Sequence, residues 1–144
     1  MYSFTLNLHH YISFAALLTL LTATINGLSG WSGNRPFKGI HQRINLIALI
    51  VCHIMLLLGI ILLIISPLAI SAFGDMGSAM KNGALRKAVI EHPFTNIIAV
   101  VLVTVAYSKI KRIPADVSKF RITAIYFGIA LILILSRLPF EKMF

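Results

Sequence analysis

Acidic residues are scarce in this sequence. Only 4 of its 144 residues are Asp or Glu, and charged residues of both signs make up 12% of the chain. A soluble domain carries about twice that charged fraction. Hydrophobic residues make up 58% of the chain and form long runs. A bilayer can accommodate such runs whereas a soluble core cannot, so the sequence predicts an integral membrane protein with the lipid bilayer as a partner.

Cysteine is almost absent, which excludes two kinds of site. The single thiol, Cys52, lies inside an apolar run, and one thiol builds neither an internal disulfide nor a thiolate metal cluster. The sequence has no C-x-x-C-H motif, so covalent c-type haem attachment is excluded. Residues 1–7 contain no Lys or Arg. Because a secretory signal begins with a positive region, we expect the first apolar run to be a retained helix.

The apolar runs predict one all-α domain over residues 1–144, a polytopic membrane protein with a bundle of four transmembrane helices. Ser66-Pro67 ends the second run, because the residue before proline avoids the α conformation. His92-Pro93 opens the third, because proline is favoured in a first helical turn. The expected spans are 4–30, 44–65, 93–107 and 122–138.

The connection between the second and third spans contains a further helical segment, residues 76–90. Met80, Ala84 and Ala88 can share one face there, whereas the basic residues lie elsewhere. This pattern predicts a short amphipathic helix that lies on the membrane surface between the second and third transmembrane helices.

Basic residues cluster between the apolar runs and give the chain a formal charge of +9. No basic stripe is interleaved with exposed aromatics, so we expect contacts with anionic lipid headgroups and no nucleic-acid partner. The loops after the first and third spans carry three and five Lys or Arg, whereas the residues before the first span carry none. By the positive-inside rule we expect these two loops in the cytoplasm and both termini on the outer side.

Polar groups inside a bilayer are costly, so each histidine in a span requires a reason. At about 100° per residue, His9 projects on the same side of its helix as Ala16 and other small residues. His92 shares a face with Asn96 and Ala99. Faces of small residues pack against neighbouring helices, so both histidines are expected to point inward.

The two histidines also match in depth. Each lies roughly 12 Å from the centre of its span, toward the same side, at the helical rise of about 1.5 Å per residue. Two inward imidazoles at one level suit the iron of a non-covalent haem b, so the sequence predicts His9 and His92 as axial ligands. Arg137 lies at the same level and can either pair with a haem propionate or extend to the interface.

His53 is the reserve ligand. It lies near the middle of the second span, in depth roughly 10 Å from the other two histidines, and helix tilt could reduce that gap. Three roles stay open for it: haem ligation, proton relay, or a structural hydrogen bond to a backbone carbonyl.

Short motifs occur along nearly the whole chain: Leu8-His9, Gly30-Trp31, Arg35-Pro36-Phe37, Cys52-His53, Ala79-Met80-Lys81-Asn82, Leu85-Arg86 and Glu91-His92-Pro93. With this combination, the chain resembles a group of small four-helix membrane proteins of Bacteroidota that are described as cytochrome b-like. The resemblance implies a bacterial inner membrane and shared histidines at His9, His53 and His92, so the outer side on which both termini are expected is the periplasm. Where these relatives tend to have Ser-Gly after the first histidine, this chain has His10-Tyr11.

Two functions therefore stay open. The first is electron transfer through haem b between a quinol and a partner. The second is a haem-free structural or accessory subunit that packs against other membrane-protein subunits through its small-residue faces. A transporter or channel has less support, because few polar residues lie near the bilayer centre. The sequence offers no Ser-His-Asp set, phosphate loop or carboxylate within an expected span, so hydrolytic and nucleotide chemistry have no support, and an electron-transfer or accessory protein is favoured over a stand-alone enzyme.

Overall fold

The computed structural model describes residues 1–138, and they form four long helical stretches that are apolar enough to cross a membrane. The first two are α1 (Tyr2–Ser32) and α2 (Gly39–Ile65). The third joins α5 (Gly83–Arg86), the π-helix η1 (Lys87–Glu91) and α6 (His92–Ile110). The fourth joins α7 (Asp116–Ile122), the π-helix η2 (Thr123–Phe127) and α8 (Gly128–Ser136). The predicted all-α, four-helix membrane bundle is confirmed.

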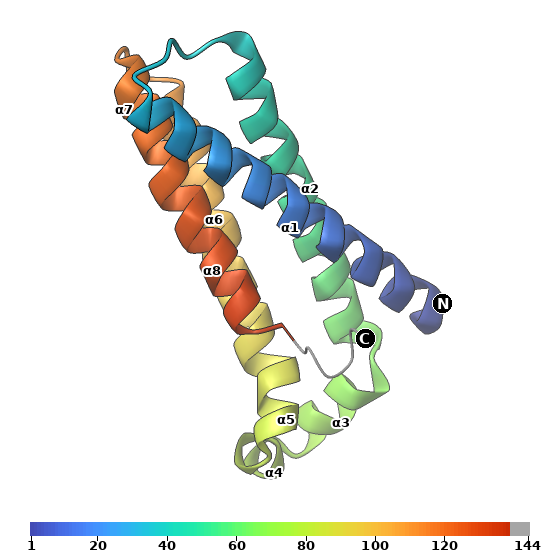
Figure 1. Cartoon of the computed structure of the whole chain (residues 1–144). Coiled ribbons are helices and arrows are strands. Elements are labelled where there is room, and N and C mark those ends of the chain that lie inside the picture. Colours follow the sequence, from blue (N-terminus) through green and yellow to red (C-terminus); the bar gives the residue numbers. More distant parts are fainter. Residues whose placement is uncertain (139–144) are drawn as a thin grey trace.

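The four stretches form a closed ring of neighbours. Helix α1 contacts α2 and η2, α2 contacts α6, and α6 contacts α8. The loops that follow α1 and α6 lie at one end of the bundle, and α3 (Pro67–Gly74) and α4 (Met76–Lys81) lie at the other (Figure 1). Consecutive spans therefore run antiparallel.

The surface helix predicted over residues 76–90 is only partly correct. Helix α4 covers its first six residues and ends at Lys81, and the backbone of the next residue, Asn82, is extended. From Gly83 onward the chain continues into the third span without a break. The third span thus begins ten residues before its predicted start at residue 93, and Pro93 lies inside it.

Pro93 explains why the third span contains the π-helix η1 directly before His92. Pro93 has no N–H, and its ring would clash with the carbonyl of the residue four positions earlier in a regular α-helix. The structure widens to a π-helix over the five residues directly before His92. Such π-turns keep a helix continuous and occur frequently at functional sites.

Caps order the connection between the second and third spans. The carboxylate of Asp75 accepts hydrogen bonds from the Ser78 amide at 3.1 Å and from the Ser78 hydroxyl at 2.7 Å. These bonds favour the ionised form and lower the pKa of Asp75. Asn82 in turn accepts a hydrogen bond from the Leu85 amide at 3.1 Å and so begins the third span.

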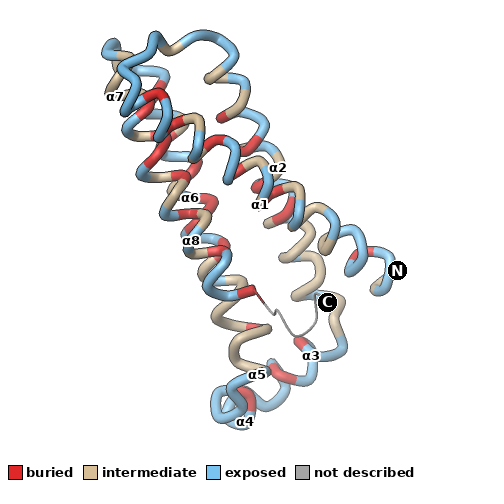
Figure 2. The backbone as a smooth tube through the Cα atoms, viewed as in Figure 1, coloured by how far each residue is buried: buried red, intermediate tan, exposed pale blue. Residues whose placement is uncertain are grey.

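The main core lies in the middle of the bundle and toward the α7 end. Small and medium side chains dominate it: Ala16, Leu20, Ala23, Ala48, Cys52, Met55, Ala99, Val100, Val103, Ala106, Phe127, Ala130 and Ile134. The inward orientation predicted for the small-residue faces of the first and third spans is confirmed. Beyond Met55, α2 has no buried residue, and its remaining residues are half-buried or exposed (Figure 2). Packing is therefore looser at the α3 end.

Candidate functional site

A cavity of about 650 Å³ opens at this loosely packed end. Its walls come from α1, α2, α3, α5, η1 and α6, and most of the lining residues are aliphatic. The polar exceptions are His9, Ser66, Lys87, His92, Asn96 and Arg137. Cofactor and small-molecule sites have volumes of about 300–1,000 Å³ and apolar walls with a few polar groups, so this cavity is the candidate site.

The two histidines that the sequence pairs do meet in this cavity. The ring centroids of His9 and His92 are 6.3 Å apart, and the ring planes are nearly perpendicular, at 83°. One ring comes from α1 and the other from the first turn of α6. The separation leaves room for one metal ion between the imidazoles, since a metal–imidazole bond is about 2 Å long.

Hydrogen bonds hold the His92 ring in one orientation. Its Nδ1 lies 3.1 Å from the backbone carbonyl oxygen of Arg137, which can only accept, so Nδ1 carries the proton. The unprotonated Nε2 accepts from the side-chain amide of Asn96 at 3.0 Å. A histidine that ligates a metal commonly donates its other ring N–H to a carbonyl in this way.

His9 has a different environment. Its Nδ1 is buried and has no hydrogen-bond partner among residues 1–138. Gly59 of α2 lies beside the ring: a Cβ atom built there would be 3.4 Å from Cε1 of His9. A buried polar atom without a partner costs about 1–3 kcal/mol, and a ligand in the cavity that bonded this imidazole would offset that cost.

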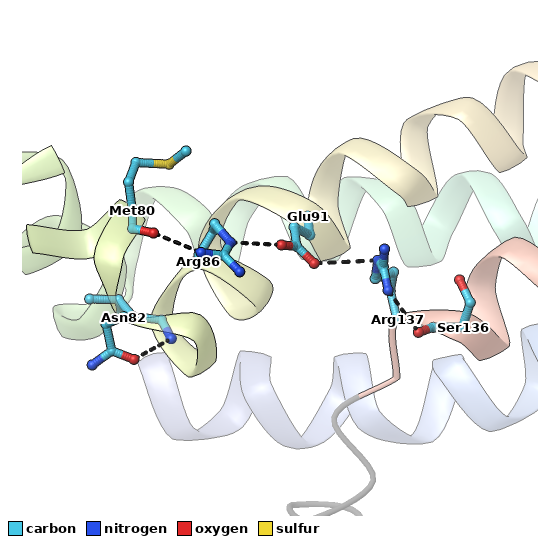
Figure 3. A network of polar contacts seen from close by, with 7 residues as sticks. Met80, Asn82, Arg86, Glu91, Ser136 and Arg137 are labelled. Carbon is cyan, nitrogen blue, oxygen red and sulfur yellow. Dashed lines mark hydrogen bonds and ion pairs between the residues drawn. The ribbon is translucent and has the colours of Figure 1, made fainter. Parts of the chain in front are cut away.

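Arg137 lines the cavity from the end of α8 and belongs to a chain of ion pairs (Figure 3). Its Nε lies 3.4 Å from Oε2 of Glu91. The other carboxylate oxygen of Glu91 accepts from Nε of Arg86 at 2.9 Å. Arg86 also donates to the carbonyl oxygen of Met80 at 2.8 Å. The network connects α4, the π-helix η1 and the end of α8 beside the cavity.

His53 does not reach the cavity. Its side chain is exposed on the outside of α2, where Nδ1 donates to the carbonyl oxygen of Leu49 at 2.8 Å. Its Nε2 lies 3.5 Å from the hydroxyl of Thr104. Among the roles left open for His53, this geometry is that of a histidine bonded to a backbone carbonyl.

The remaining histidines also lie away from the cavity. His10 packs edge-on against Phe14, with 5.0 Å between ring centroids. His41 lies in the first turn of α2. There it is 2.9 Å from the side-chain oxygen of Asn26 and packs against Phe120.

The side chains around the cavity fit a non-covalent haem. No group of three His, Cys, Asp or Glu side chains within residues 1–138 is placed to hold a metal ion by itself. A haem needs only two axial ligands from the protein, because its macrocycle provides the others. The two imidazoles, the unpartnered Nδ1 of His9, the arginine and the apolar walls match this requirement.

Sequence reasoning missed Glu91 and Gly59. Glu91 was placed outside the spans, because the third span was expected to begin at Pro93. Its position directly before His92 was the available signal. The sequence contained no signal for Gly59, since its role depends on where α1 and α2 cross.

Fold and cavity together define a four-helix membrane protein with a two-histidine cavity between its helices. Comparison of the chain with protein-family models, with curated proteins and with solved structures found no match. The function is therefore argued from the site itself.

Proposed function

We propose that this protein binds one haem b in the cavity and transfers electrons in a bacterial inner membrane. The observation that supports this best is the pair of imidazoles, His9 and His92, whose centroids lie 6.3 Å apart in an apolar cavity. A bound haem would supply one-electron chemistry, with a potential set by its axial ligands and by burial.

The chain's own residues would bind and orient the group. His9 and His92 would hold the haem iron through their imidazole nitrogens, and the Arg137 carbonyl would keep the His92 ring turned toward the cavity. The guanidinium of Arg137 engages Glu91 through Nε and the Ser136 carbonyl through Nη1, which leaves Nη2 for a propionate. The aliphatic walls would exclude water.

The basic loops predict the side of the membrane on which the cavity lies. If the basic loops after α1 and α6 face the cytoplasm, the cavity lies near the periplasmic side. The protein would then transfer electrons between a quinol within the bilayer and a partner. The apolar surfaces of the spans would contact lipid or other membrane-protein subunits.

An absorbance spectrum of the purified protein, oxidised and then reduced with dithionite, tests the proposal. We expect a six-coordinate b-type spectrum in the wild type. His92→Ala and His9→Ala should each lose it, because one imidazole rarely holds a non-covalent haem. His10→Ala and His53→Ala are matched controls and should keep it, since neither side chain lines the cavity.

Two results would contradict the proposal. One is a folded His92→Ala protein that keeps the six-coordinate spectrum. The other is a wild-type protein that stays colourless after expression with added haem. The second result would favour the alternative, a haem-free accessory subunit, and co-purification with a larger membrane complex would then support it.

A further inference from the structure

We propose that Glu91 is a positioning residue for the haem ligand His92 and acts through Arg137. This inference rests on the proposed function, because it assigns a role in a haem site. Glu91 immediately precedes His92, so consecutive residues of the third span contact Arg137 in two ways. The Glu91 carboxylate lies 3.4 Å from the Arg137 side chain, and the His92 ring donates to the Arg137 backbone carbonyl at 3.1 Å.

The two contacts close a ring between the third and fourth spans. Arg137 is the first residue beyond α8, and its backbone has left the helical conformation, with φ −119° and ψ 12°. Its carbonyl therefore has no place in the helical ladder and can accept from His92. The ion pair with Glu91 fixes the residue that carries this carbonyl (Figure 3).

Arg86 holds Glu91 from the other side. It donates from Nε to the carboxylate at 2.9 Å and from a terminal nitrogen to the carbonyl of Met80 at 2.8 Å. The Glu91 carboxylate therefore forms ion pairs with two guanidinium groups, those of Arg86 and Arg137. Its exposed fraction is 30%, and partly exposed ion pairs of this kind add little to stability. Its main effect is on geometry, because it decides where the Arg137 carbonyl points.

The chemistry at His92 explains why this geometry matters. With Nδ1 protonated and bonded to the carbonyl, the lone pair of the ring lies on Nε2, where it accepts from Asn96 and where a metal would replace that bond. Without the carbonyl partner, Asn96 is the remaining partner of the ring, and its amide can bond Nε2 in either tautomer by presenting its nitrogen or its oxygen, so the imidazole can exchange tautomers. Removal of such outer partners commonly weakens metal binding by about 10–100-fold.

The test uses Glu91→Gln, with Asp75→Asn as the control. Both substitutions remove one negative charge, but Asp75 caps α4, does not line the cavity, and keeps an acceptor as Asn. The first readout needs no haem: ¹⁵N NMR of histidine-labelled protein in detergent micelles reports the tautomer of His92. We expect the Nδ1–H form in the wild type and in Asp75→Asn, and a mixture of tautomers in Glu91→Gln.

Haem titration gives the second readout. Glu91→Gln should still bind haem through both histidines, with a dissociation constant raised about tenfold. Arg137→Gln breaks the same ion pair from its other end and leaves the backbone carbonyl in the chain. It should produce the same mixture of tautomers, and the double variant should add nothing further. Arg137→Gln also tests the inference if the Glu91→Gln protein does not fold.

The inference is overturned if the tautomer in both Glu91→Gln and Arg137→Gln stays as in Asp75→Asn. A wild-type protein that takes up no haem, but whose His92 tautomer responds to Glu91→Gln, would remove the proposed function and keep the positioning role. The two failures are thus distinguishable.

Discussion

Gly59 is the position on α2 that faces the ring of His9. A Cβ atom there would make an ordinary van der Waals contact with the ring, at 3.4 Å from Cε1. A longer side chain would extend into the cavity, which Gly59 itself lines. The space that the imidazole needs therefore depends on a small residue on the neighbouring helix.

This contact predicts different results for two substitutions at one position. Gly59→Ala should leave haem binding unchanged, whereas Gly59→Leu should weaken it at least about tenfold, equivalent to about 1.4 kcal/mol. The leucine would occupy the space in front of His9, and the fold should remain because the position borders a cavity. Haem titration of both purified variants measures the effect, and circular dichroism checks the fold. Equal affinities for the two variants would contradict the placement of haem beside Gly59.

At the residue level, the helical period was sufficient to find the inward histidines. His9 and His92 share their faces with small residues that are buried in the structure, such as Ala16 and Ala99. Residue type alone did not reveal that His53 bonds its own helix at Leu49. That outcome depends on how α2 is rotated within the bundle, and its almost entirely apolar sequence leaves the rotation undetermined.

At the level of elements, α1 and the fourth span approach closely at two glycines. A Cβ atom at Gly27 would lie 2.6 Å from the backbone nitrogen of Ala124, and one at Gly30 would overlap the ring of Phe120. Small residues at such crossings let helix backbones pack closely in membranes. The crossing contains no space for a further methyl group.

Gly27→Ala should therefore destabilise the bundle, by about 1–3 kcal/mol, which is usual for overpacking. The backbone of Ala124 would have to move, because backbone cannot rotate away as a flexible side chain does. Denaturant unfolding in detergent micelles measures the change. Gly39→Ala is the control, since a Cβ atom there meets nothing within 4 Å. A Gly27→Ala protein as stable as this control would show that the crossing is looser than described.

The number of spans followed from the apolar runs, but their ends did not. All four helical stretches begin before the predicted residues, and the third begins at Gly83. Polar and basic residues such as Lys87 and Arg86 were assigned to a surface segment, because charge in a span is costly. In the structure they belong to the spanning helix, and Arg86 pairs with Glu91. Such pairing depends on tertiary contacts that periodicity does not encode.

At the level of the whole molecule, charge is distributed unequally between the two ends of the bundle. The end that carries the loops after α1 and α6 has one acidic residue, Asp116, and eight basic ones: Arg35, Lys38, Arg43, Lys109, Lys111, Arg112, Lys119 and Arg121. Among residues 1–138, the cavity end has two acidic residues, Asp75 and Glu91, and four basic ones: Lys81, Arg86, Lys87 and Arg137. Figure 1 shows that both basic loops lie at the same end, as an antiparallel four-span bundle requires.

The positive-inside rule converts this asymmetry into a topology. We expect the basic end in the cytoplasm, and the N-terminus, α4 and the cavity on the periplasmic side; the predicted periplasmic C-terminus lies outside the described residues.

A Cys52→Ala background removes the only native thiol, which is buried in the core. In that background, a membrane-impermeant maleimide applied to intact spheroplasts should label Ser78→Cys and should label Ser32→Cys only after lysis. Both positions are exposed in the structure and lie at opposite ends of the bundle, so no other part of residues 1–138 covers them. Labelling of both from the same side would contradict the four-span topology, and the reverse pattern would place the cavity, with its two histidines, toward the cytoplasm.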